Sequence, residues 1–205
     1  MKKLICIIAA LVLGISALAQ TPEEIITRMD ETMTAREGEG LSMTVETKLF
    51  MIGKVSMKMY SLGNKMRIET NVLGHHMIDW SDDTTDWSYN IDTEQITITN
   101  AKEGSGDGDE KEMLSGITDG YDVSLKSETD KEWVILCKKS KGNKEKDAPK
   151  TMTLTVSKSN YYPVSLVAKV AGVNMVLKDF GFGVSEDFVT FNPANYPNAT
   201  IEDKR

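Results

Sequence analysis

The chain has 205 residues, of which 40% are hydrophobic and 27% charged, so it has the composition of one globular domain and not of a disordered tail. Its formal net charge is -7, with 31 Asp and Glu against 24 Lys and Arg. This balance argues against a protein that binds nucleic acid through phosphate contacts.

The N-terminal segment has the pattern of a secretory signal. Two lysines precede an apolar run, and Ala17 and Ala19 supply the small residues of a cleavage site. The run is shorter than the roughly 20 apolar residues that a membrane-spanning helix needs. We therefore expect a signal peptide at 1–19 and a single domain at 20–205, located in the periplasm.

Cleavage after Ala19 would change the cysteine count and the charge. It removes Cys6 and two lysines, which leaves Cys137 as the one cysteine and a net charge of -9. Cys137 ends the apolar run Trp-Val-Ile-Leu-Cys, so we expect a buried side chain and not a reactive thiol.

An amphipathic helix is predicted directly after the cleavage site. Thr21 is followed by proline and, three residues later, by Glu24, which is a capping box. Glycines at 38 and 40 end the pattern. The helical period places four apolar residues on one face: Ile25, Ile26, Met29 and Met33.

From residue 41 the apolar period changes from 3.6 to 2, which predicts antiparallel strands. We expect strands at 41–49, 55–59, 65–72, 77–81, 85–90, 95–99, 121–126, 133–138, 151–157, 164–170 and 174–178, with a last one at 188–191. A segment rich in Gly, Asp and Glu at 100–112 leads to a region that could hold a short helix. About eleven strands exceed what a small filled barrel needs. The predicted fold is a mainly β, unclosed antiparallel barrel, with an N-terminal amphipathic helix and a short helical lid over an apolar cavity.

Methionine is concentrated in the predicted helix and first strands, which gives two interpretations. A flexible, polarisable wall can adapt to acyl chains, or the methionines fill gaps in an ordinary core. Trp87 and Tyr89 share a strand face and either line the interior or form an exposed patch. The predicted lipid-binding cavity consists of Met29, Met33, Met43, Val45, Val55, Met57, Met59, Met66, Ile68, Val72, Trp87, Tyr89, Ile96, Ile98, Met113, Leu114 and Ile117.

Three other motifs have simpler explanations. Residues 75–76 are two histidines near Asp79, but neighbours on a strand point to opposite faces, so a solvated turn is favoured over a metal site. Residues 107–110 resemble the start of a calcium loop, but its fifth position is Lys111 and its sixth is Glu112, so the acidic ligand and the turn glycine are missing. Six lysines lie at 138–150; they could meet anionic lipid head groups or an acidic partner, or simply form a charged hairpin tip. We expect no metal, no cofactor and no enzyme activity, because no nucleophile and base are placed together.

The segment at 81–99, SDDTTDWSYNIDTEQITIT, resembles the LolA-type outer-membrane lipoprotein carrier family. The closing element at 188–193 is similar to that family's last segment. The resemblance implies an unclosed barrel of about eleven strands with a helical lid over an apolar cavity. Where well-studied carriers have an Arg-Pro pair, this chain has Leu62-Gly63, and Arg67 is expected on the polar face of its strand.

The same resemblance implies a function and partners. The cavity would take the acyl chains of lipoproteins or of a related lipid and carry them across the periplasm towards the outer membrane. The partners would be an inner-membrane donor complex and a possible outer-membrane acceptor, with transient contact with membrane-bound partners and a monomeric carrier. The alternative is an envelope regulator that senses lipids or lipoproteins and acts through protein–protein interactions.

Overall fold

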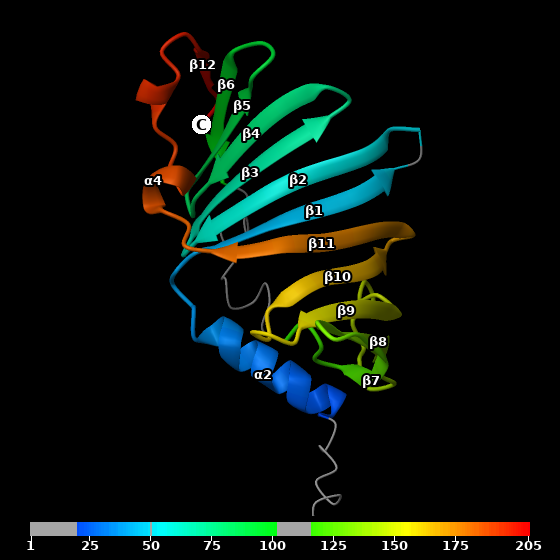
Figure 1. The fold of residues 1–205 in the computed structure, drawn as a ribbon. Helices are drawn as coiled ribbons and strands as arrows, with labels where there is room; N and C mark the ends of the chain where they lie inside the picture. The colour runs from blue at the N-terminus through cyan, green and yellow to red at the C-terminus, as the bar shows by residue number, and fades with distance from the viewer. Residues whose placement is uncertain (1–19, 50, 102–115) are drawn as a thin grey trace, which may run out of the picture.

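The computed structural model describes residues 20–49, 51–101 and 116–205. Its main feature is one twelve-stranded sheet with the strand order β12-β6-β5-β4-β3-β2-β1-β11-β10-β9-β8-β7 (Figure 1). Among the described strands, β12 and β7 stand at the two ends of this order and do not pair, so the barrel is open. The predicted mainly β fold with an open sheet and one main helix is confirmed. The region predicted to hold a short helical lid lies largely outside the described residues.

The sheet and its helices follow one another along the chain in a simple order. The elements are α2 (Pro22–Thr34), β1 (Leu41–Leu49), β2 (Gly53–Leu62), β3 (Lys65–Val72), β4 (His75–Ser81), β5 (Thr85–Asn90), β6 (Gln95–Asn100), β7 (Tyr121–Glu128), β8 (Glu132–Lys139), β9 (Thr151–Ser157), β10 (Pro163–Val170), β11 (Val173–Phe182), α4 (Glu186–Val189), η2 (Pro193–Asn195) and β12 (Thr200–Asp203).

Helix α2 begins at the predicted capping box. The Thr21 hydroxyl accepts a hydrogen bond from the Glu24 amide at 3.2 Å, and the Thr21 amide donates to the Glu24 carboxylate at 3.0 Å. The four predicted apolar residues are buried, and each contributes about 1.5–3 kcal/mol by leaving water: Ile25, Ile26, Met29 and Met33.

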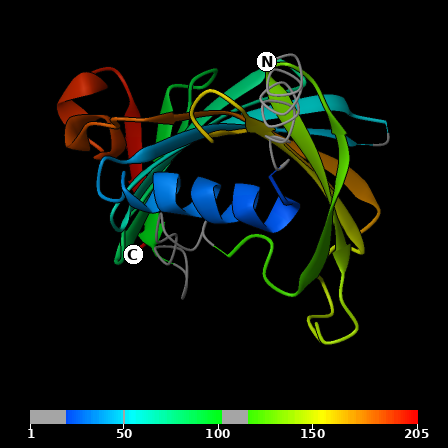
Figure 2. The same cartoon turned by 60° about the horizontal axis from the view of Figure 1, so that its bottom comes forward.

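The register of the strands defines two faces. Residues directly opposite each other in antiparallel strands share a face. Val45 lies opposite Met57 in β2 and Leu177 in β11, and all three belong to the cluster that packs with α2. We call this side the α2 face and the other side the outer face. The sheet curves around α2, which crosses its hollow side (Figure 2).

The C-terminal segment covers part of the outer face, and here the prediction of a strand at 188–191 is wrong. Residues 186–189 form α4, and the next residues run across the sheet without pairing in it. Phe188 packs edge-on against Tyr60 with ring centroids 4.8 Å apart. Phe188 and Phe191 therefore cover a surface of the sheet and do not add a strand to it.

The same segment then provides a strand that the sequence analysis missed. β12 pairs with β6, and it is the one described strand that runs parallel to its neighbour. All four of its residues are exposed, so it has no apolar alternation to reveal it.

Candidate functional site

The α2 face changes from apolar to polar across the sheet. In one cross-strand row, Met59 is followed by Ile68, Asp79, Ser88 and Thr97. The adjacent row repeats the change, running from Leu41 through Ser61, Met66, Ser81 and Asp86 to Thr99. This face therefore presents an apolar surface on β1–β3 and hydrogen-bonding groups on β4–β6.

The structure places the predicted cavity residues in three groups. The first is packed in the interior or deeply buried on the α2 face: Met29, Met33, Met43, Val45 and Val55. The second is half-buried on the same face, beside that packed region: Met57, Met59, Met66, Ile68 and Val72. Ile117 packs against the α2 cluster from a turn before β7, while Met113 and Leu114 lie outside the described residues.

The third group lies on the opposite face, so the structure does not gather the predicted residues around one cavity. Trp87 and Tyr89 do share a face, but Trp87 lies opposite Trp80 and Ile98, on the outer side of the sheet. Ile96 is opposite Tyr89 and fully buried there. These side chains pack under the C-terminal segment.

The sequence of the β3–β4 hairpin sets the register that separates the predicted cavity residues between the two faces of the sheet. Leu73-Gly74 forms a two-residue turn, so Val72 lies opposite His75. Counting back along the hairpin places Asp79 opposite Ile68. Because β4 thus turns Asp79 to the α2 face, Ile78 and Trp80 face outward and need a separate cover.

A shallow pocket of about 350 Å³ lies at the polar part of the α2 face. Two serine hydroxyls donate hydrogen bonds to its carboxylates, from Ser88 to Asp79 and from Ser81 to Asp86, both at 2.6 Å. Met66 and Ile68 line the same pocket. The pocket combines an apolar floor with acceptors suited to a polar group that donates hydrogen bonds.

Helix α2 is attached to the β9–β10 turn by two arginines. The Arg28 guanidinium donates to the Tyr161 hydroxyl at 3.0 Å and lies over its ring. Arg36 donates to the Tyr162 hydroxyl at 2.6 Å and lies 4.6 Å from the centre of the Phe182 ring. These contacts are at the rim of the α2 face and are partly exposed, so they stabilise the packed position of α2 without burying it further.

Asp30 on α2 has a perturbed acidity. Burial raises the pKa of its carboxyl from 3.8 to about 6, and the nearby charge of Asp119 adds to the shift. The charged form of Asp30 therefore destabilises the contact between α2 and the turn before β7.

Arg67 lies on the outer face, opposite in direction to Met66 and Ile68, as expected from the alternation. It is not a solvated side chain, however. Its guanidinium is 5.1 Å from the Trp80 ring centre and 4.1 Å from that of Phe188, and it bonds to Glu69 at 2.7 Å. Arg67 thus holds the C-terminal segment on the sheet.

The remaining sequence motifs are placed as follows. Cys137 is fully buried, as predicted, and burial raises the pKa of its thiol to about 11. The His75 and His76 side chains are exposed at the start of β4, and both lie near Asp92 and not Asp79. Residues 107–110 lie outside the described residues.

Comparison with known proteins does not identify a family. No family model matches the chain, and no curated protein matches its sequence. An uncharacterized conserved protein from Thermus thermophilus is 16% identical with a TM-score of 0.48, over 90% of this chain and 100% of that one. A LolA superfamily protein from Nitrosomonas europaea is 12% identical with a TM-score of 0.32, over 84% and 99%.

A third solved structure is the MucA/MucB complex of Pseudomonas aeruginosa. The matched chain is 10% identical, with a TM-score of 0.42, over 82% of this chain and 60% of that one. In the part of the chain that the structure describes, no helix is long and apolar enough to cross a membrane.

Proposed function

We propose that this protein binds an acylated amphiphile on its α2 face and carries it through the periplasm. The observation that carries the proposal is the half-buried apolar strip of Met57, Met59, Met66 and Ile68, which lies between the packed core under α2 and the polar pocket of β4–β6. An acyl chain would cover the strip, and each methylene removed from water would contribute about 0.8 kcal/mol.

In the proposed mechanism, the apolar part of the α2 face on β1–β3 and its polar part on β4–β6 bind different parts of the ligand. The acyl chain would lie along β1–β3, where unbranched methionines adapt to its shape. A polar group near the chain would bond to the carboxylates of Asp79 and Asp86. Binding needs no covalent step, no metal and no cofactor.

Movement of α2 would regulate access to the deeper part of the face. If the contacts of Arg28 and Arg36 with the β9–β10 turn open, Met29 and Met33 leave the interior and Met43 becomes available to the ligand. A ligand that binds the open form would shift the population towards it by its difference in affinity for the two forms. Closing would then favour release to an acceptor.

The proposal also covers export of the chain, its organisation as one domain, its cargo and its partners. Residues 1–19 would direct export and be removed, and residues 20–205 would act as one monomeric carrier domain. The cargo would be a lipoprotein or related lipid, received from an inner-membrane donor and passed towards the outer membrane.

The first test is native mass spectrometry with lipid extraction of the protein purified from its own host. Co-purified acyl lipid or lipoprotein near a one-to-one ratio would support the carrier. A ligand-free protein bound stably to a membrane-anchored signalling protein would favour the alternative, a lipid- or lipoprotein-sensing regulator.

A second test assigns the binding face. Met59→Gln and Met66→Gln keep the side-chain length but place an amide on the strip, so we expect each to weaken binding of a fluorescent fatty-acyl probe by roughly tenfold. The matched control is Val167→Thr, because Val167 is 40% exposed and lies on the outer face. Equal binding by all three variants would contradict the proposed site.

A further inference from the structure

The two ends of the strands differ in the chemistry of their turns. At one end, the turns read Gly63-Asn64, Asp83-Thr84, Asp130-Lys131 and Ser159-Asn160, which are ordinary polar turns. The other end carries the β1–β2, β3–β4, β5–β6, β8–β9 and β10–β11 connections, and we call it the tip rim. Figures 1 and 2 agree that the β1–β2 and β10–β11 turns point the same way, away from α2.

Large apolar side chains project from the tip rim into solvent. Met51 in the β1–β2 turn is 91% exposed, and Leu73 in the β3–β4 turn is 69% exposed. Ile52 and Ile91, each 40% exposed, lie in the β1–β2 and β5–β6 turns. Because β2 and β3 are neighbours in the sheet, the two most exposed side chains are on adjacent hairpins.

The backbone at these positions makes the choice of residue unusual. Met51 has φ 70° and Leu73 has φ 54°, in the left-handed region where Gly, Asn and Asp are favoured. A large apolar side chain at such a position is unfavourable for the turn and for solvation. These exposed apolar side chains therefore oppose the conformational preference of their turns. This points to a role in binding another molecule.

The rim continues into a basic surface on the next strands of the sheet. The β8–β9 connection carries Lys141, Lys144, Lys146 and Lys150, and Lys169 precedes the β10–β11 turn. All five are exposed, and none of them forms an ion pair with another described residue.

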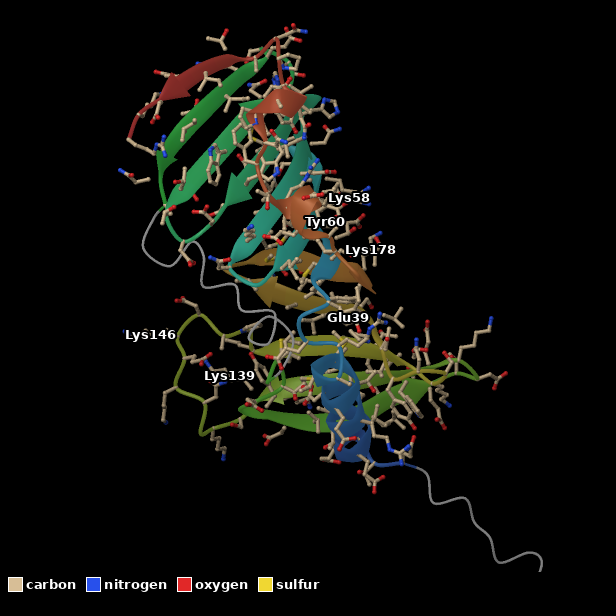
Figure 3. The ribbon with its side chains drawn as sticks, turned by 90° about the vertical axis from the view of Figure 1, so that its left-hand side faces the viewer. Glu39, Lys58, Tyr60, Lys139, Lys146 and Lys178 are labelled. Atoms are coloured by element: carbon tan, nitrogen blue, oxygen red, sulfur yellow. The ribbon has the colours of Figure 1, made fainter. Side chains whose placement is uncertain are left out.

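These lysines lie around a groove and on a projecting loop. Lys146, Lys150 and Lys169 line a groove of about 660 Å³ between the β8–β9 and β10–β11 connections. Figure 3 shows the loop that carries Lys146 standing away from the sheet, beyond Lys139 at the end of β8. Asp147 also lines the groove and Glu145 lies in the same connection, but the five lysines outnumber these two acidic residues. This surface is therefore positive in a chain whose net charge is -7.

We propose that the tip rim docks on a lipid bilayer that contains anionic phospholipid. Met51, Ile52 and Leu73 would enter the interfacial region of the bilayer, and the lysines of the β8–β9 and β10–β11 connections would meet its head groups. Separate apolar tips on the β1–β2 and β3–β4 hairpins, at the same end of the strands as these exposed lysines, fit a fluid anionic surface. Because the turns at the other end of the strands are polar, only the tip rim would face the bilayer. The docked molecule would therefore have a single orientation.

This inference does not depend on the proposed cargo. The α2 face would take its ligand whether or not the rim touches a membrane, and the rim would dock without cargo. Vesicle binding by the ligand-free protein therefore tests the rim alone, while lipid extraction tests the carrier proposal.

The experiment is flotation of the purified protein with vesicles of phosphatidylcholine alone or mixed with phosphatidylglycerol. We expect binding to the anionic vesicles at low salt and strong loss of binding in about 1 M salt, where the Debye length is about 3 Å. Binding to phosphatidylcholine alone should be much weaker, because the lysines have no anionic surface to meet.

The variants separate docking from folding. M51N/L73N introduces the residue that left-handed turns prefer, so the variant should fold at least as well as wild type, yet bind anionic vesicles at least about tenfold more weakly. Its control is Leu125→Asn, which changes an exposed apolar residue on β7. K146Q/K150Q/K169Q should also bind at least about tenfold more weakly, whereas Lys131→Gln at the opposite end should not.

Three results would overturn the proposal. The first is wild-type protein that stays unbound with anionic vesicles at low salt. The second is flotation of M51N/L73N equal to that of wild type. The third is binding only to vesicles that contain membrane proteins, which would assign the rim to a protein partner.

Discussion

Asp30 shows how a single residue can weaken the position of the helix that covers the interior. The folded-state pKa of about 6 lies above the ordinary value of 3.8, so the folded protein holds the Asp30 proton more tightly than the unfolded chain does. This contribution to stability is fully present below pH 3.8 and is lost as the pH rises through 6. Above that pH, the charged carboxylate destabilises the fold.

Asp30→Asn should therefore stabilise the protein at neutral pH and not at low pH. We expect about 1 kcal/mol more stability at about pH 7.5, a value reduced for the partial exposure of Asp30, and little difference near about pH 4. Urea unfolding at several pH values measures this. Asp119→Asn should give a smaller gain, and a gain for Asp30→Asn that is the same at all pH values would contradict the explanation.

Leu73 is a second residue with an unfavourable local conformation, because its backbone is left-handed and its side chain is large and apolar. Its φ of 54° favours asparagine, so Leu73→Asn should raise the free energy of unfolding by about 1 kcal/mol. Chemical denaturation measures the change. Ile91 is also exposed in a turn but is not in the left-handed region, so Ile91→Asn should give no gain; a loss of stability in L73N would contradict the argument.

At the scale of elements, the C-terminal segment acts as the cover of the outer face. Phe191 lies 5.4 Å from the Trp80 ring centre and 5.5 Å from that of Trp87, and Tyr196 packs on Tyr89 at 4.7 Å. Without this cover, the apolar residues of β4–β6 that point outward would be exposed.

Phe191→Ala should loosen this segment. We expect a loss of about 1–3 kcal/mol and a red shift of tryptophan emission, since Trp80 and Trp87 gain water. Fluorescence spectra and denaturation curves measure both. The control is Ile201→Ala on β12, which is 50% exposed and should change neither. Unchanged emission in the Phe191 variant would show that the cover does not depend on this ring.

Helix α2 depends on contacts at its rim as well as on its apolar face. Arg36→Gln removes the hydrogen bond to Tyr162 and the stacking on Phe182, so amide hydrogens of α2 should exchange several-fold faster. Hydrogen exchange measured by mass spectrometry tests this. Glu37→Gln in the same exposed turn is the control, and equal exchange in both variants would contradict the role of Arg36.

At the scale of the whole molecule, one sheet carries two apolar clusters on opposite faces. The α2 cluster spans β1, β2 and β7–β11, while the outer cluster spans β4–β6 and is joined to β2 and β3 by α4. Because neighbouring strands connect the two, we expect residues 20–205 to unfold in one transition.

The two clusters contain different tryptophans, so this can be measured. Trp133 reports on the α2 cluster, and Trp80 and Trp87 report on the outer one. Trp133→Phe and a double Trp80→Phe and Trp87→Phe variant should each give fluorescence curves that coincide with the circular dichroism curve of the same variant. Two separate midpoints within either variant would indicate two units that fold independently.

The sequence by itself determined the helix, the first eleven strands and the open sheet. The capping box at Thr21 and the period of 3.6 identify α2, and the period of 2 identifies β1–β11, because these signals are local. The burial of Cys137 followed from the apolar strand around it.

Only the tertiary structure decided which of the two faces of the sheet packs against α2 and what covers the other one. Alternation shows that Trp87 and Tyr89 share a face, but not that α2 lies on the other one. The apolar and β-branched residues at 188–191 have the composition of a strand, yet Phe188 and Phe191 pack across β2–β5 because those strands expose apolar side chains outward. A pattern of period 2 fixes two faces, and long-range packing determines which of them becomes the interior.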